Sequence, residues 1–143
     1  MRWTALALLA LGPAAAAAQD GTQDAADPTG AEAGQAAFME ACAGCHGGDA
    51  TGGGPTAQLL TVDVPDLTLI AARSDGGFDV ARVIRLIDGR AGIAAHGGPM
   101  PLFGGLLTGP SAVVDGPDGS PVATTEPILA IARWLETVQE TPQ

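Results

Sequence analysis

The sequence of 143 residues contains no tyrosine, three phenylalanines and two tryptophans, and its six Lys+Arg residues, all arginine, stand against sixteen acidic residues. Because nucleic acids and anionic membrane surfaces attract clustered positive charge, the shortage of basic residues argues against both as partners. The shortage of large rings leaves little to fill a core. A chain of this size would therefore gain from a large buried prosthetic group.

The first 18 residues have the pattern of a secretory signal peptide. Arg2 supplies positive charge, residues 5–11 are apolar, and Ala16 to Ala18 provide small residues for cleavage. The apolar run is interrupted at Gly12 and is shorter than the ~20 apolar residues that cross a membrane. We therefore expect no membrane span, and export to the periplasm of a strongly acidic mature protein.

The rest of the chain divides into a linker and one domain. Residues 19–28 have no apolar periodicity and are expected to form a disordered acidic linker, followed by a single domain over residues 29–143. Apolar residues spaced by three or four predict helices over residues 29–42, 79–88 and 125–138. The residues expected to cap them are Thr29, Asp79 and Thr125. The predicted fold class is all-α, with long loops.

Glycine and proline indicate where these loops lie. Five glycines between residues 47 and 55 predict a tight irregular loop, and residues 63–68 are expected to be extended around Pro65. Residues 104–124 form a longer Gly- and Pro-rich segment. Within it, apolar residues on either side of residues 115–120 favour a short hairpin.

The motif that carries chemistry is Cys42-Ala43-Gly44-Cys45-His46, which has the C-x-x-C-H spacing of covalent haem attachment. Two thiols three positions apart can reach the two vinyl groups of one haem, and the next residue brings an imidazole to the iron. The other ring nitrogen of His46 needs an acceptor, for which the Pro55 carbonyl is a candidate. The motif predicts one covalent haem c with its iron as cofactor.

Three other uses of these cysteines compete with haem attachment: a disulfide, a redox pair and a zinc site. An oxidising compartment would favour a plain disulfide, although a structural bridge needs no following histidine. A thioredoxin-like redox pair needs a βαβ setting that this sequence lacks. Cys42, Cys45 and His46 also form a Cys₂His₂ zinc set together with His96, but adjacent Cys45 and His46 would reach one tetrahedral ion only with strain.

The sixth iron ligand is expected to be Met100, which stands between Pro99 and Pro101. The two prolines stiffen the backbone in an extended form, which suits a thioether held toward the iron without a helix behind it. His96 is the alternative ligand. A histidine and methionine pair would give a higher reduction potential than two histidines.

These residues resemble the class I cytochrome c family, in particular its short bacterial periplasmic members, over roughly residues 33–140. Gly34 and Phe38 match the first helix of that family, and Trp134 matches an aromatic of its last helix. Pro55 and Met100 match its proline after the haem-binding loop and its distal methionine. The resemblance implies an all-α shell around haem in which the first and last helices cross near Gly34. The sequence departs from the family in lacking the lysine ring of the mitochondrial members.

The expected function is a one-electron carrier between a redox protein donor and acceptor. No nucleophile or general-base arrangement is evident outside the haem motif, so an enzyme is not predicted. A monomer is expected, and Arg73, Arg85 and Arg90 are candidates for contacts with the haem propionates. The alternative is a haem-bearing subunit or gas sensor tied to a specific redox enzyme, and a peroxidase is a third possibility.

Overall fold

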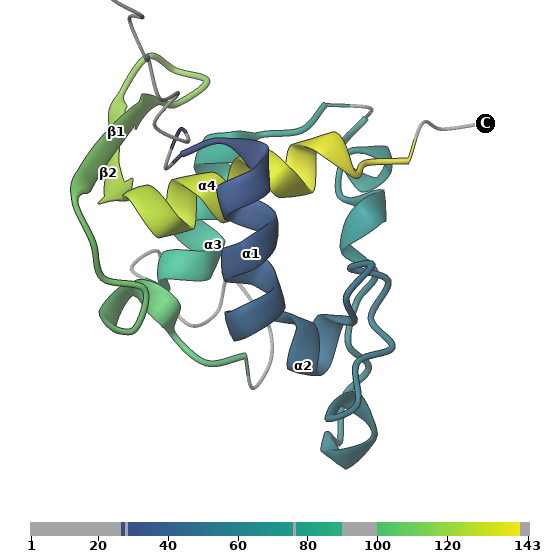
Figure 1. Ribbon diagram of the computed structural model, residues 1–143. Coiled ribbons are helices and arrows are strands. Elements are labelled where there is room, and N and C mark those ends of the chain that lie inside the picture. The colour runs from purple at the N-terminus through teal and green to yellow at the C-terminus, as the bar shows by residue number, and fades with distance from the viewer. Residues whose placement is uncertain (1–26, 28, 76, 90–99, 141–143) are drawn as a thin grey trace, which may run out of the picture.

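The computed structural model describes residues 27, 29–75, 77–89 and 100–140. In this part of the chain there are four α-helices and one two-stranded sheet (Figure 1). The helices are α1 (Ala31–Ala41), α2 (Ala43–His46), α3 (Val80–Asp88) and α4 (Glu126–Thr137), and the strands are β1 (Ser111–Asp115) and β2 (Pro121–Thr125). Short 3₁₀ turns occupy the connections: η1 (Ala57–Leu59), η2 (Leu67–Leu69), η3 (Ala72–Ser74) and η5 (Phe103–Gly105). None of the described helices has the length and apolar character needed to cross a bilayer. The expected signal peptide, His96 and Arg90 lie outside the described residues.

The core is built where α1 crosses α4 (Figure 1). Gly34 is buried at the crossing, and a side chain there would overlap the Ala130 carbonyl, so the two backbones are in direct contact. One turn later, Phe38 packs on Trp134 with ring centroids 4.4 Å apart. The absent side chain at Gly34 therefore sets the separation of the helices, and the aromatic pair fills the space beside them. The crossing agrees with what the family resemblance implied.

Helix α3 follows the predicted bounds because both of its end signals are local. The Asp79 side chain accepts a hydrogen bond from the Arg82 backbone N–H at 2.9 Å, and Gly89 ends the helix in the left-handed conformation, with φ of 75°. Its apolar face is buried among the core residues and includes Val83, Ile84 and Ile87. This helix packs against α4 and forms a wall of the pocket described below.

The predicted cap of α1 is wrong, whereas the predicted cap of α4 is confirmed in its position but makes no capping hydrogen bond. Both helices begin within two residues of the expected positions. Gly30 is the N-cap of α1, and Thr29 instead donates its hydroxyl to Asp27 and accepts a hydrogen bond from Arg133. Thr125 is the N-cap of α4, as expected, but its side chain makes no capping hydrogen bond, and its hydroxyl donates to the Leu107 carbonyl at 2.7 Å. At both positions the hydroxyl therefore bonds to a residue distant in the sequence, Arg133 for Thr29 and Leu107 for Thr125.

The hairpin expected within the long loop is confirmed. Strands β1 and β2 pair antiparallel with Val113 opposite Ala123, and Gly119 supplies the positive φ of the turn. The side chains of Ala112, Val114 and Val122 face the core and are partly buried against it. The fold is therefore a helical body with one small sheet, which is more than the class all-α describes.

Candidate functional site

The cysteine motif lies on a single helical turn at the end of α1. The Cys42 N–H still donates to the Phe38 carbonyl of α1, at 2.8 Å, and the His46 N–H donates to the Cys42 carbonyl, at 3.0 Å. Helix α2 therefore continues directly from α1 after Cys42, and its last residue is His46. Cys42 and His46 are buried, at 7% and 8% exposure, whereas Cys45 is half-buried. One turn of chain thus carries all three functional groups.

The glycine-rich loop that follows returns along this turn. The N–H groups of Gly52, Gly54 and Thr56 donate to the carbonyls of His46, Cys45 and Gly44, at 2.8, 3.0 and 2.8 Å respectively. Gly52 has a positive φ of 97°, which a residue with a side chain rarely adopts. We call residues 52–56 the strap. Because three successive carbonyls of the motif are held by the strap, the backbone that carries Cys45 and His46 has little freedom.

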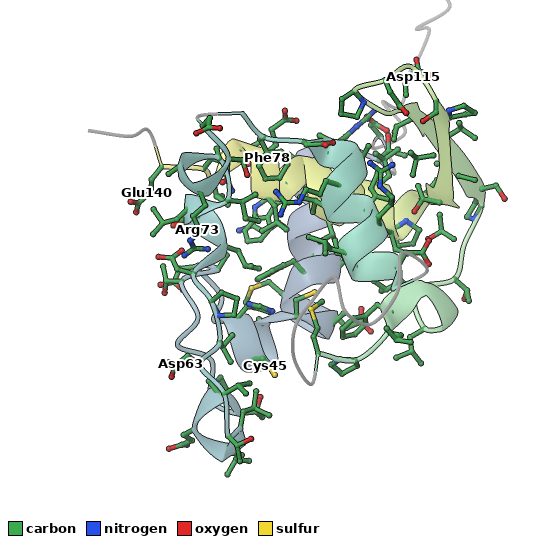
Figure 2. All side chains as sticks on the ribbon, turned by 180° about the vertical axis from the view of Figure 1, so that it is seen from behind. Cys45, Asp63, Arg73, Phe78, Asp115 and Glu140 are labelled. Atoms are coloured by element: carbon green, nitrogen blue, oxygen red, sulfur yellow. The ribbon has the colours of Figure 1, made fainter. Side chains whose placement is uncertain are left out.

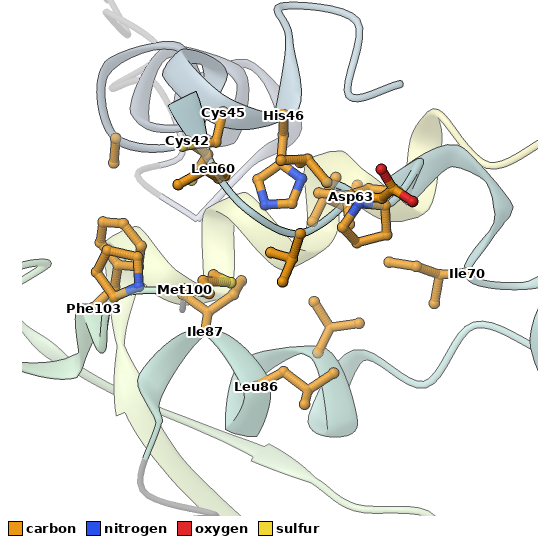
Figure 3. A pocket seen from close by; sticks show the side chains of 18 residues that line it. Cys42, Cys45, His46, Leu60, Asp63, Ile70, Leu86, Ile87, Met100 and Phe103 are labelled. Atoms are coloured by element: carbon orange, nitrogen blue, oxygen red, sulfur yellow. The ribbon is translucent and has the colours of Figure 1, made fainter. Parts of the chain in front are cut away.

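A pocket of about 400 Å³ opens beside the motif turn (Figure 3). Its walls come from α1 and α2, from the segment between α2 and α3, from α3, and from the segment around η5. The His46 ring and the Met100 side chain both enter this pocket, from different walls (Figure 3). The described residues that line it are almost all apolar, and they are Ala41, Cys42, Cys45, His46, Leu60, Val62, Asp63, Val64, Pro65, Leu67, Ile70, Val83, Leu86, Ile87, Met100, Pro101, Phe103 and Leu135.

Four of the predicted site residues therefore line one pocket: Cys42, Cys45, His46 and Met100. Pro55 belongs to the strap but is not among the lining residues, and its carbonyl accepts a hydrogen bond from Gln58 Nε2 at 3.2 Å. A carbonyl oxygen has two lone pairs, so the bond expected from His46 to Pro55 stays a prediction.

Of the arginines expected at the haem propionates, Arg73 and Arg85 are not among the described residues that line the pocket, and Arg90 lies outside the described residues. Arg73 donates to the Asp66 carbonyl at 2.8 Å, and Arg85 lies on α3. The described residues that line the pocket include one charged side chain, the carboxylate of Asp63. Figure 2 shows Cys45 and Asp63 on neighbouring segments at this end of the molecule.

Sequence reasoning missed the wall that residues 60–65 contribute. Leu60, Val62 and Val64 alternate with polar residues, which is the pattern of an extended segment with one apolar face. No regular strand forms there, because the segment lies between η1 and η2 and has no neighbouring strand among the described residues. This alternation is the feature of the sequence that indicates that one face of the segment borders an apolar space.

The described residues bear on two of the alternatives to haem, the disulfide and the zinc site. Cys42 and Cys45 are both free thiols. Among the described residues, no three His, Cys, Asp or Glu side chains are grouped so that they could hold a metal ion. The zinc set included His96, which lies outside the described residues, so that alternative is not tested.

In the haem-free chain the two thiols are expected to react at different rates. Burial, with a smaller contribution from the neighbouring Cys45 thiol, raises the pKa of the Cys42 thiol to about 11. At pH 8 only about one Cys42 in a thousand is then a thiolate, the form that reacts with iodoacetamide. We expect Cys45 to be alkylated well before Cys42 in folded, haem-free protein, as measured by peptide mapping over time. Equal rates in the folded protein would contradict the burial of Cys42, and equal rates in denaturant provide the control.

The chemistry of this pocket fits a haem. It is large and apolar, two thiols lie at one wall, and an imidazole and a thioether, both established iron ligands, enter from different sides. In a comparison with known protein families, a family model described as Cytochrome c matches residues 31–107. No curated protein and no solved structure matches the chain. The matched region runs from α1 to just past η5 and includes every predicted site residue.

Proposed function

The chain belongs to the cytochrome c family, whose function is electron transfer with a covalently bound haem, and we propose that it is a periplasmic one-electron carrier with a single haem c. Cys42 and Cys45 would hold the haem through thioether bonds, and His46 and Met100 would be its axial ligands. The haem iron supplies the chemistry by taking up and releasing one electron. The observation that carries this proposal is the shared pocket of His46 and Met100, which lie 54 positions apart in the sequence.

The chain's own residues contribute three things to this function. Apolar side chains such as Val83, Ile87 and Leu135 exclude water from the pocket, which disfavours the extra charge of the oxidised iron and raises the reduction potential. The strap holds the His46 backbone in place. The Met100 thioether, as a soft ligand, also favours the reduced iron. With His46 and Met100 both holding the iron, no ligand would have to arrive or leave during electron transfer.

We also propose how the chain is divided and in which compartment the protein acts. Residues 1–18 form a cleaved signal peptide, residues 19–28 a linker, and residues 29–143 the cytochrome domain, which acts as a monomer outside the cytoplasm. A net charge of -10 for the full chain favours a basic or neutral redox partner. The protein is not an enzyme on this proposal, because an iron with two protein ligands has no open position for a substrate.

Carbon monoxide tests whether the sixth position is closed. Carbon monoxide binds ferrous haem iron at an open axial position, so the reduced wild-type protein should show no spectral change under it. Replacement of Met100 by alanine removes the thioether and should make binding complete. The same variant should have a lower reduction potential, because the thioether no longer favours ferrous iron.

Two other results would change the assignment. Binding of carbon monoxide by the wild-type protein would favour the gas-sensor alternative, in which Met100 yields to a ligand. Co-purification of the exported protein with a larger redox enzyme would favour the alternative of a haem-bearing subunit.

A further inference from the structure

The chain around Met100 lies between the pocket and the end of α3. We call residues 100–105 the methionine segment. Three of its residues line the pocket (Figure 3): Met100, Pro101 and Phe103. Two others, Leu102 and Gly104, alternate with them and contact the last turn of α3 and the glycine that follows it. One side of the methionine segment therefore forms a wall of the pocket, and its other side rests on α3.

Two close contacts join the methionine segment to α3. A Cβ atom on Gly104 would overlap Asp88 Oδ1 and lie 2.5 Å from the Asp88 carbonyl oxygen. At the next residue of the helix end, a Cβ atom on Gly89 would overlap Leu102 Cδ2 and lie 3.1 Å from Leu102 Cβ. A side chain fits at neither glycine unless the methionine segment and the helix end move apart. The close contact at Gly104 is made with backbone as well as side chain.

Helix α3 is the firmer of these two partners. Its Ile84 and Ile87 side chains belong to the hydrophobic core. Asp88 is 6% exposed, so its carboxylate has little room to turn away. The only helical turn in the methionine segment is the three-residue η5, and Leu102 is 47% exposed. A side chain at Gly104 should therefore displace the methionine segment rather than α3.

We infer that Gly104 is a positioning residue for Met100. Because it has no side chain, the methionine segment rests directly on the end of α3, and this contact sets how firmly the Met100 thioether holds the haem iron. The inference rests on the proposed function and deepens it. Gly104 is not among the residues that line the pocket, so it acts through the position of Met100.

A competing ligand measures how firmly Met100 is held. Imidazole binds oxidised haem iron at the sixth position after the thioether has left it. Its apparent dissociation constant is therefore the intrinsic constant divided by the fraction of molecules in which that position is open. Displacement of the methionine segment raises this fraction and lowers the apparent constant. The titration is followed by the sulfur-to-iron charge-transfer band, which disappears as imidazole replaces Met100.

The test uses the exported, haem-containing full chain. Gly104→Ala adds the side chain that the contact excludes, and Gly105→Ala is its matched control, because a Cβ atom on Gly105 would meet no atom within 4 Å. Gly34→Ala controls for a general loss of stability, since its overlap lies between α1 and α4. Leu102→Ala removes atoms from the second contact without adding any, so it tests the same contact even if Gly104→Ala does not retain its haem.

We expect Gly104→Ala to lower the apparent dissociation constant of imidazole about tenfold, which corresponds to about 1.4 kcal/mol. This lies within the usual cost of an added carbon atom at a packed position. Leu102→Ala should lower the constant by a smaller factor, while Gly105→Ala and Gly34→Ala should equal wild type. Wild-type constants in both Gly104→Ala and Leu102→Ala would overturn the inference and leave the proposed function intact. A decrease in Gly34→Ala as large as that in Gly104→Ala would also overturn it.

A double variant shows whether Gly104 acts through Met100. In Met100→Ala the thioether is gone, so the further change Gly104→Ala should leave the imidazole constant as it is in Met100→Ala alone. A second decrease in the double variant would overturn the inference, because Gly104 would then act on the pocket without Met100. Absence of the charge-transfer band from the wild-type protein would instead contradict the ligation by Met100 in the proposed function itself.

Discussion

Replacement of Gly54 by alanine is expected to remove most of the covalently bound haem and to lower the free energy of unfolding by about 3 kcal/mol. A Cβ atom at this position would lie 2.5 Å from both the Ala43 and Gly44 carbonyl oxygens and 2.6 Å from the Cys45 carbonyl carbon. All three are backbone atoms of the motif turn, so no side-chain rotation relieves the overlap. The strap must move away, and the hydrogen bond from Gly54 to Cys45 is lost with it.

The matched control for this variant is the adjacent residue. A Cβ atom on Gly53 would meet no atom within 4 Å, so Gly53→Ala should stay within about 0.5 kcal/mol of wild type and retain its haem. Denaturant unfolding followed by circular dichroism gives the free energies, and absorbance per unit of protein gives the haem content. If Gly54→Ala and Gly53→Ala behave alike, the strap does not lie against the motif turn as described.

Replacement of Gly34 by alanine should also lower the free energy of unfolding, by a similar amount. Helix propensity alone would predict the opposite change, because alanine favours a helix more than glycine does. In the interior of an exposed helix, glycine to alanine stabilises by about 1 kcal/mol. At Gly34 the new methyl group would lie 2.5 Å from the Ala130 carbonyl carbon and 2.8 Å from Trp134 Cβ, and would overlap the Ala130 oxygen. Helices α1 and α4 must separate to accommodate it, which weakens the contact between Phe38 and Trp134.

The measurement shows whether Gly34→Ala raises or lowers the free energy of unfolding. Thermal and denaturant unfolding of Gly34→Ala should both show destabilisation, while Gln35→Ala, on the exposed side of the same helix, should change the stability by less than about 0.5 kcal/mol. A gain in stability for Gly34→Ala would mean that helix propensity dominates and that the helices are not in backbone contact at this residue.

Parts of the fold that depend on neighbouring residues were predictable from the sequence. Helix α3 begins at its Asp79 cap and ends at Gly89 as expected, because both signals act within one turn. In α4, the spacing of Ile128, Ile131 and Trp134 identified the face that is buried. The C-x-x-C-H motif identified the site for the same reason, since its three functional groups lie within five residues.

Features that depend on distant partners were not predictable in the same way. The cap expected at Thr29 is wrong, and Thr125 is the N-cap of α4 but makes no capping hydrogen bond; their hydroxyls bond instead to Arg133 and to the Leu107 carbonyl, far along the chain. The glycine run indicated a loop after His46, but not that it returns along the motif with Thr56 against Cys45. That arrangement depends on which carbonyl accepts a hydrogen bond from each backbone N–H of the strap. The amino-acid composition of the loop does not determine this pairing.

The central claim is that one haem is covalently attached in the pocket between His46 and Met100. The most direct measurement is the absorption spectrum of the exported full-length protein, recorded before and after denaturation and extraction with acidic organic solvent. We predict that the haem stays with the chain after extraction and that the native oxidised protein shows the weak sulfur-to-iron charge-transfer band, which Met100→Ala abolishes. Extraction of the haem would contradict covalent attachment, and a band that persists in Met100→Ala would contradict the ligand assignment.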